Sequence, residues 1–170
     1  LRERVALLKG LPESVVDEVI RNRITLTPGG VTLVATMKHH GAYTALVSGG
    51  FTAFTSRIAK RIGFDENRAN VLITEDGMLT GSVREPILGR QAKIEALEQI
   101  AARLGITPAE AMAVGDGAND LGMIRLAGLG VAIHAKPAVA AEADIRIEHN
   151  DLTALLYLQG YARSEWTTPD

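Results

Sequence analysis

Residues 111–120 read AMAVGDGAND, a short apolar run that leads directly into a loop of glycines and acids. The apolar part predicts a buried strand over 111–114, and a helix is expected from about residue 119. Asp116, at the tip of the strand, can ligate a hard cation, while Asn119 and Asp120 can bind polar groups or orient the cation's ligands. The plainer interpretation is an Asx turn in which Asp120 caps the helix. A simple turn rarely needs all of these residue types, so the stretch favours a function.

The rest of the chain alternates between short apolar runs and helical patterns, which predicts a parallel sheet wrapped by helices. Asp76-Gly77 is a strong hairpin signal, and it predicts an antiparallel flap beside that sheet. Thr27-Pro28 predicts a helix N-cap and first turn, with the helix ending at Gly41. The other expected elements are strands at 42–47, 70–75, 78–84, 130–133 and 144–147, and helices at 1–9, 12–22, 51–62, 89–104 and 151–158, with a short one from Pro137. The first two helices form a small module of their own.

A second unusual loop follows the strand that ends at Val47. Ser48-Gly49-Gly50 places a hydroxyl and two residues without side chains before a helix. Backbone N–H groups in such a turn can approach an anion closely, and Ser48 can donate a further hydrogen bond. The alternative is that small residues only allow a tight turn between strand and helix. By itself this stretch does not decide between the two.

Lys93 lies in the early turns of the helix expected at 89–104. A lone lysine on a helix is usually a solvated surface charge, so its pattern alone indicates no function. It becomes a candidate only together with the two loops.

Composition excludes several classes of protein. The 170 residues are 46% hydrophobic and 22% charged, with a net charge of −2, so no basic field exists to hold a nucleic acid. No apolar stretch approaches the roughly 20 residues that cross a bilayer, so a cytoplasmic protein without membrane contact is expected. Without cysteine, a metal must be held by oxygen or histidine ligands, and oxygen favours magnesium, calcium or manganese. The chain opens at Leu1 within a helical pattern, as a piece of a longer gene product would.

The order of these features resembles a known family. A hydroxyl with glycines after one strand, a lysine on an intervening helix and a GDGxND loop after a later strand are similar to three motifs of the haloacid dehalogenase-like superfamily. The stretches LRERVALLKGLP at the start, VSGGFTAF around Ser48 and VAIHAKP at 131–137 resemble its phosphoserine phosphatase family. The resemblance implies a Rossmann-like α/β core over 27–170, with the β-hairpin flap, and the remnant of a helical cap over 1–26.

The resemblance also implies roles for individual residues. Ser48 and the N–H of Gly49 would bind the substrate phosphate, Lys93 would neutralise phosphate and nucleophile, and Asp116 would ligate Mg²⁺. Asn119 would contact the phosphate, and Asp120 would support Lys93 and the waters on the metal. Arg4, in LRERV, would pair with the carboxylate of phosphoserine, for which its planar fork is suited. Without the family match, Arg4 is an ordinary exposed helix residue.

The family's DxDxT motif, which carries the aspartate nucleophile and the general acid/base aspartate, does not occur in these residues. The resemblance places that motif after the central strand, upstream of the cap. The chain alone is therefore expected to be inactive, because covalent catalysis needs the carboxylate nucleophile. Without the central strand, the neighbouring strands would expose backbone N–H and C=O groups that have no hydrogen-bond partner. We expect the chain to associate with an upstream segment or to exchange strands with a second copy.

The leading hypothesis is a Mg²⁺-dependent hydrolysis of O-phospho-L-serine to L-serine and phosphate, in serine biosynthesis, by the parent enzyme. One alternative is a phosphatase or phosphotransferase acting on phosphohomoserine or another small phosphate ester. The other is a module that binds phosphate without catalysis.

Overall fold

The computed structural model describes residues 1–168, which divide into two compact units. One unit contains Leu1–Ile87 together with the chain from Asp151 onward, and the other contains Leu88–Asn150. Helices and strands alternate in both, as the sequence predicts. The assignment of a cap remnant to 1–26 and a core to 27–170 stays a prediction.

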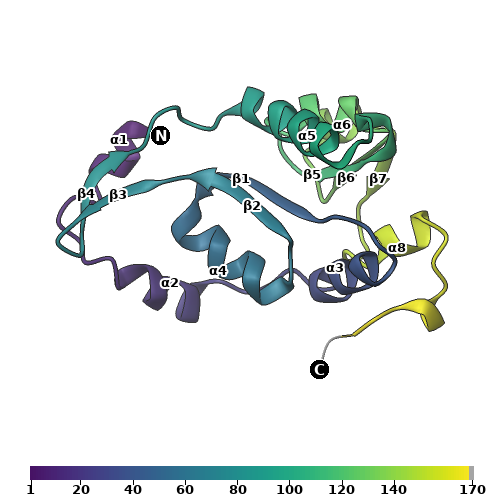
Figure 1. Ribbon diagram of the computed structural model, residues 1–170, viewed down its shortest axis with the longest axis horizontal. Coiled ribbons are helices and arrows are strands. Elements are labelled where there is room, and N and C mark those ends of the chain that lie inside the picture. Colours follow the sequence, from purple (N-terminus) through teal and green to yellow (C-terminus); the bar gives the residue numbers. More distant parts are fainter. Residues whose placement is uncertain (169–170) are drawn as a thin grey trace. The chain divides into compact units, whose positions relative to one another are not determined.

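The first unit is built on a parallel pair of strands, β1 (Ala45–Phe51) and β2 (Glu66–Asn70). Helix α4 (Thr52–Ile62) connects them, packs on both and ends at Gly63, whose φ of 101° suits glycine. Helix α3 (Gly30–His39) packs on α4 and on α8 (Ala154–Leu158), so helices from the early and the late part of the sequence lie side by side in one unit (Figure 1).

The predicted hairpin is present as β3 (Leu72–Glu75) and β4 (Met78–Val83), with Asp76 and Gly77 in the turn. Helix α1 (Arg2–Ala6) packs beside β4. Gly81 allows this close approach, because a Cβ there would lie 2.9 Å from Lys9 Cβ. The chain then adds to the edge of β4 through a hydrogen bond from Leu79 N to Leu11 O, 2.8 Å long, before α2 (Val15–Arg23) begins.

The second unit contains three parallel strands in the order β5 (Met112–Gly115), β6 (Leu129–Ile133) and β7 (Ile145–Ile147). Its core includes Val131 and Ile124, which are 0% exposed. The sequence Thr107-Pro108-Ala109-Glu110 predicts a capping box, and the structure confirms it. The helical elements are α5 (Arg90–Leu104), the 3₁₀ turn η1 (Pro108–Glu110), α6 (Leu121–Leu126) and α7 (Pro137–Ala140).

Three local expectations are wrong. Helix α3 is capped at Gly29 rather than Thr27, because Gly29, with φ of 81°, lies against Asp151 and Thr153, where a Cβ would clash. The strand at 66–70 was not expected, since its polar sequence lacks alternation. The first strand runs on through Ser48 to Phe51, with an irregular register after Val47.

The parallel strands also fall into two separate ladders. Within residues 1–168, β1 pairs only with β2, and β5 pairs only with β6. Strands β1 and β5 therefore each keep one edge without a strand partner in the described chain.

The polar sequence after Tyr161 predicts a frayed end, but residues 162–168 are docked on α3. Thr167 N donates a 2.9 Å hydrogen bond to the hydroxyl of Thr36, a residue that is 0% exposed. The Tyr161 ring stacks on His40 with centroids 4.4 Å apart, and η2 (Arg163–Glu165) forms between these contacts. These contacts order the segment despite its polar composition. None of the helices in residues 1–168 is long and apolar enough to span a bilayer.

A polar cluster around Asp65 ties α3 and α4 to the start of β1. Its carboxylate pairs with Lys38 Nζ at 2.7 Å and accepts hydrogen bonds from the backbone N and hydroxyl of Thr44, both 2.9 Å. Lys38 also donates to Gly63 O, at the end of α4. Partial burial raises the pKa of the Asp65 carboxyl, but Lys38 and the Thr44 hydrogen bonds outweigh it, and the pKa lies below its usual value.

This shift predicts acid sensitivity. The charged Asp65 contributes its stabilisation above its unfolded pKa of about 3.9 and loses it as the pH falls through the lower folded pKa. Asp65→Asn is expected to lower the free energy of unfolding at pH 7 and to flatten its decline between pH 5 and 3. Urea unfolding at several pH values measures this. Asp76→Asn, at the hairpin turn, is the control and should follow the wild type. Equal acid slopes for wild type and Asp65→Asn would contradict the assignment.

Candidate functional site

The carboxylate of Asp120 organises the loop after β5. The residue occupies the N-cap position of α6 but makes no capping hydrogen bond with its side chain. Instead Oδ2 accepts hydrogen bonds from the backbone N of Asp116, at 3.2 Å, and of Gly117, at 3.0 Å. The other oxygen, Oδ1, forms an ion pair with Lys93 Nζ. Asp120 is thus the N-cap residue of α6, as the plainer interpretation expects, but its side chain bonds the preceding loop and Lys93 instead of capping the helix.

The ion pair of Lys93 and Asp120 is largely buried, with side chains 12% and 4% exposed. Lys93 lies in the first turn of α5, so the pair joins this helix to the β5–α6 loop. A buried charge costs several kcal/mol unless it is paired and hydrogen-bonded, and both conditions hold for Asp120. Lys93 is thus no solvated surface lysine.

Glycines in the loop make room for this carboxylate. A Cβ on Gly115 would clash with the Asp120 side chain, with Cγ only 2.5 Å away. A Cβ on Gly117 would meet the Asn119 side chain. Gly115 is therefore required by close packing, whereas the exposed Asn119 side chain could move aside for a larger residue at position 117.

Asp116 and Asn119 are exposed at the same loop, and their side chains make no hydrogen bond or ion pair within residues 1–168. An exposed carboxylate at a strand end, beside a loop held in one conformation, suits a hard cation such as Mg²⁺. No cluster of three His, Cys, Asp or Glu side chains that could hold a metal is present in the part of the chain described. Asp116 therefore offers one carboxylate ligand, and a Mg²⁺ ion would need its remaining ligands from water, substrate or other groups.

Ser48 lies in the irregular end of β1, three residues before Phe51, the N-cap of α4. Its hydroxyl oxygen accepts a hydrogen bond from Gly50 N at 3.0 Å, and this leaves the hydroxyl proton to be donated elsewhere. Gly49 is exposed, and a Cβ there would meet no atom within 4 Å. The turn can thus be approached from outside at Gly49.

Sequence reasoning missed Asn70, at the end of β2. The residue is 2% exposed, and its Nδ2 donates to the carbonyl oxygens of Gly49 at 3.0 Å and Gly50 at 3.3 Å. Asparagine is unfavourable in strands, so an Asn that ends a short polar stretch next to an apolar one is a signal that could have found it.

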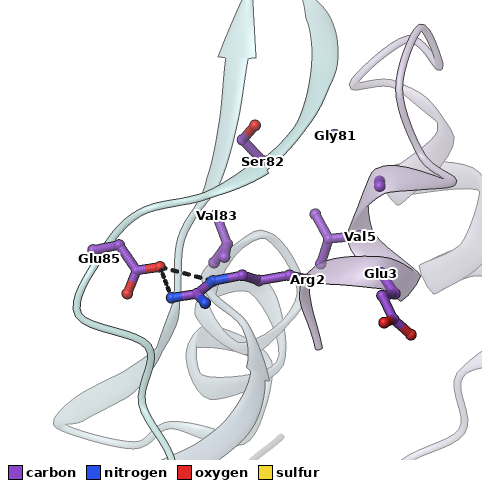
Figure 2. A pocket seen from close by; sticks show the side chains of 8 residues that line it. Arg2, Glu3, Val5, Gly81, Ser82, Val83 and Glu85 are labelled. Atoms are coloured by element: carbon purple, nitrogen blue, oxygen red, sulfur yellow. Dashed lines mark hydrogen bonds and ion pairs between the residues drawn. The ribbon is translucent and has the colours of Figure 1, made fainter.

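Arg4 lies on α1 beside the buried Val5, and its exposed side chain forms no hydrogen bond or ion pair within residues 1–168. A pocket next to α1 is lined instead by Arg2, Val5, Val83 and Glu85, among others (Figure 2). Arg2 crosses it to pair with Glu85 at 2.7 Å. Of the two arginines, only Arg4 is left unengaged.

The candidate residues thus form two groups. Lys93, Asp116, Asn119 and Asp120 share one loop region of the second unit, where Lys93 contacts Asp120 directly. Ser48, Gly49 and Arg4 belong to the first unit, on β1 and α1. The roles assigned to these seven residues stay predictions.

The known proteins that are similar to this chain point to one family. The model of haloacid dehalogenase-like hydrolases matches residues 1–125. A phosphoserine phosphatase of a Polaromonas species is 49% identical over 162 residues, which cover 93% of this chain and 69% of that protein. The phosphoserine phosphatase of Methanocaldococcus jannaschii is 46% identical, and the match covers 92% of this chain and 74% of that protein. That of Streptomyces coelicolor is 45% identical over the whole of this chain, which spans 41% of that protein.

Solved structures agree. One, described as a phospho-aspartyl intermediate analogue of phosphoserine phosphatase, is 45% identical with a TM-score of 0.85, covering 93% of this chain and 75% of that one. A structure of a probable phosphoserine phosphatase from Vibrio cholerae is 37% identical with a TM-score of 0.90. The match covers 97% of this chain and 51% of that one. These likenesses confirm the α/β fold class predicted from the sequence.

The buried ion pair predicts a strong coupling in stability. Lys93→Met should lower the free energy of unfolding by about 3 kcal/mol, because it leaves the Asp120 carboxylate buried without its counter-charge. The double variant Lys93→Met/Asp120→Asn should cost less than the sum of the single changes. Chemical denaturation of the four proteins in the cycle measures the difference. Lys136→Met, at an exposed lysine of the same unit, is the control, and additive costs would refute the coupling.

Proposed function

We propose that this chain, which belongs to the haloacid dehalogenase-like hydrolase family, is part of an enzyme that hydrolyses O-phospho-L-serine to L-serine and phosphate. The buried Lys93–Asp120 pair, closing a loop that exposes Asp116 and Asn119, is the observation that carries this proposal. Near 49% identity to a phosphoserine phosphatase supports the substrate. The setting would be serine biosynthesis in the cytoplasm.

The substrate phosphate would be bound by hydrogen-bond donors and by one positive charge. The Ser48 hydroxyl and the Gly49 N–H would donate hydrogen bonds to it, as would the amide of Asn119. Lys93 would bring a positive charge close to the phosphate, and Asp120 keeps that charge in a fixed place. Arg4, whose side chain has no partner within residues 1–168, would bind the substrate carboxylate through two parallel hydrogen bonds.

Asp116 would hold Mg²⁺, for which its exposed carboxylate is suited. When bound, the ion would supply positive charge that stabilises the transferring phosphoryl group. Asp120 would keep the Asp116 backbone in place through its hydrogen bond to the Asp116 N–H.

The nucleophile would come from outside these 170 residues, since they contain no DxDxT sequence. An aspartate would attack phosphorus, serine would leave with a proton from a second aspartate, and water would then hydrolyse the aspartyl phosphate. A similar structure described as a phospho-aspartyl intermediate analogue supports this route. The open edges of β1 and β5 support pairing with an added strand, from an upstream segment of the gene product or from a second copy.

Substrate choice is tested with the full-length gene product. Phosphate release in the presence of Mg²⁺ should be fastest for O-phospho-L-serine, compared with phosphohomoserine and ethyl phosphate. Arg4→Ala should lower kcat/KM for phosphoserine about 10- to 100-fold, because a charge-assisted hydrogen bond contributes about 1.5–3 kcal/mol, and should leave ethyl phosphate turnover unchanged. Arg2→Ala, on the same helix, is the matched control.

Equal losses of kcat/KM for phosphoserine and ethyl phosphate would contradict the role given to Arg4. A preference for phosphohomoserine would replace the substrate, and phosphate binding without any turnover would indicate a binding module.

The metal site has its own test. Asp116→Asn should weaken Mg²⁺ binding to the full-length protein at least about tenfold, because it removes a charged oxygen ligand. Titration calorimetry measures the affinity directly, apart from turnover. Asp144→Asn removes one exposed carboxylate from the same unit and should leave the affinity unchanged. Unaltered Mg²⁺ affinity in Asp116→Asn would overturn the assignment.

A further inference from the structure

Asn70 is a buried polar residue that the predicted site does not use. Its side-chain amide reaches from β2 to the last part of β1 and donates to both Gly49 O and Gly50 O. A side chain that is only 2% exposed and bonds two consecutive carbonyl groups fixes two consecutive peptide planes.

Fixing these planes also fixes Ser48. The carbonyl of Gly49 and the N–H of Gly50 belong to one peptide group and point in opposite directions. When Asn70 holds that carbonyl, the Gly50 N–H is directed to the Ser48 hydroxyl oxygen, 3.0 Å away. The hydroxyl then accepts from Gly50 and has its own proton left to donate.

The glycines make such an anchor necessary. Gly49 and Gly50 have no side chains to limit their φ and ψ, so the turn has more conformations to lose than any other pair of residues would. A Cβ on Gly50 would lie 3.2 Å from Ser48 Oγ, which explains why the turn is not stiffened with a larger residue there.

We propose that Asn70 is a positioning residue for phosphate binding, which orients the Ser48 hydroxyl through the Gly49–Gly50 peptide. This inference rests on the proposed function, because that function places the phosphate at Ser48. The role needs an N–H donor at this place, so an aspartate of the same shape cannot fulfil it.

The test uses Asn70→Asp in the full-length gene product, with Asn67→Asp as the matched control. Asn67 lies on the same strand, but its Oδ1 accepts hydrogen bonds from Thr55 at 2.9 Å and Ser56 at 3.3 Å. A carboxylate keeps those bonds and adds the same charge. Asn70→Asp should raise both KM for phosphoserine and the inhibition constant of inorganic phosphate about tenfold or more, while Asn67→Asp should change each less than about twofold.

A double-mutant cycle with Ser48→Ala separates positioning from mere support of the fold. Asn70→Ala should weaken phosphate inhibition about tenfold in the wild type and less than about twofold in the Ser48→Ala background. Equal effects in both backgrounds would overturn the proposal. So would loss of folding in both Asn70 variants while Asn67→Asp folds, because Asn70 would then be structural.

The wild-type protein separates this inference from the function on which it rests. If the wild type neither binds inorganic phosphate nor hydrolyses phosphoserine, the proposed function itself fails. If it does both and the Asn70 variants match it, only the role of Asn70 fails.

Discussion

The buried carboxylate of Asp120 is the charge on which the candidate site of the second unit depends. One oxygen forms an ion pair with the Lys93 ammonium, and the other accepts hydrogen bonds from two backbone N–H groups of the loop that precedes Asp120. With the residue only 3% exposed, loss of any partner leaves a costly unpaired group. The same carboxylate therefore sets the loop after β5, the place of Lys93 on α5 and the absence of a side chain at Gly115.

The turn at the end of β1 is held by the opposite chemistry. Asp120 accepts hydrogen bonds from N–H groups and so uses up donors of its loop, whereas Asn70 donates to carbonyls and so uses up acceptors of its turn. The loop around Asp116 is left richer in oxygen atoms, which suits a cation. The turn at Ser48 is left richer in N–H and O–H donors, which suits an anion. The buried partner of each segment thus favours the sign of ligand proposed for it.

The sequence correctly predicts the elements whose signals are local. The GDGAND loop, the Asp76-Gly77 hairpin, the helix over 90–104 and the Thr107–Glu110 capping box all follow from short-range patterns. It missed features that depend on contacts far along the chain. Gly29 caps α3 because residues 151–153 lie against it, and the C-terminal segment is ordered by Thr36 on α3. Asn70 was missed because its partners lie 20 and 21 residues away on another strand.

The proposed function assigns substrate choice to an exposed residue, and phosphate binding to residues whose geometry is already fixed. Lys93 is held by the buried Asp120, and Ser48 is held by Gly50 N in a turn that the buried Asn70 also bonds, so their geometry is set before a ligand arrives. Arg4 stands on a helix of 5 residues and is exposed, while the adjacent Val5 is buried where that helix packs beside β4. Its guanidinium must lose rotamer freedom when it binds a carboxylate, which weakens the net gain. Recognition of the carboxylate should therefore be easier to change by mutation than recognition of phosphate, since Arg4 can be replaced without disturbing a buried network.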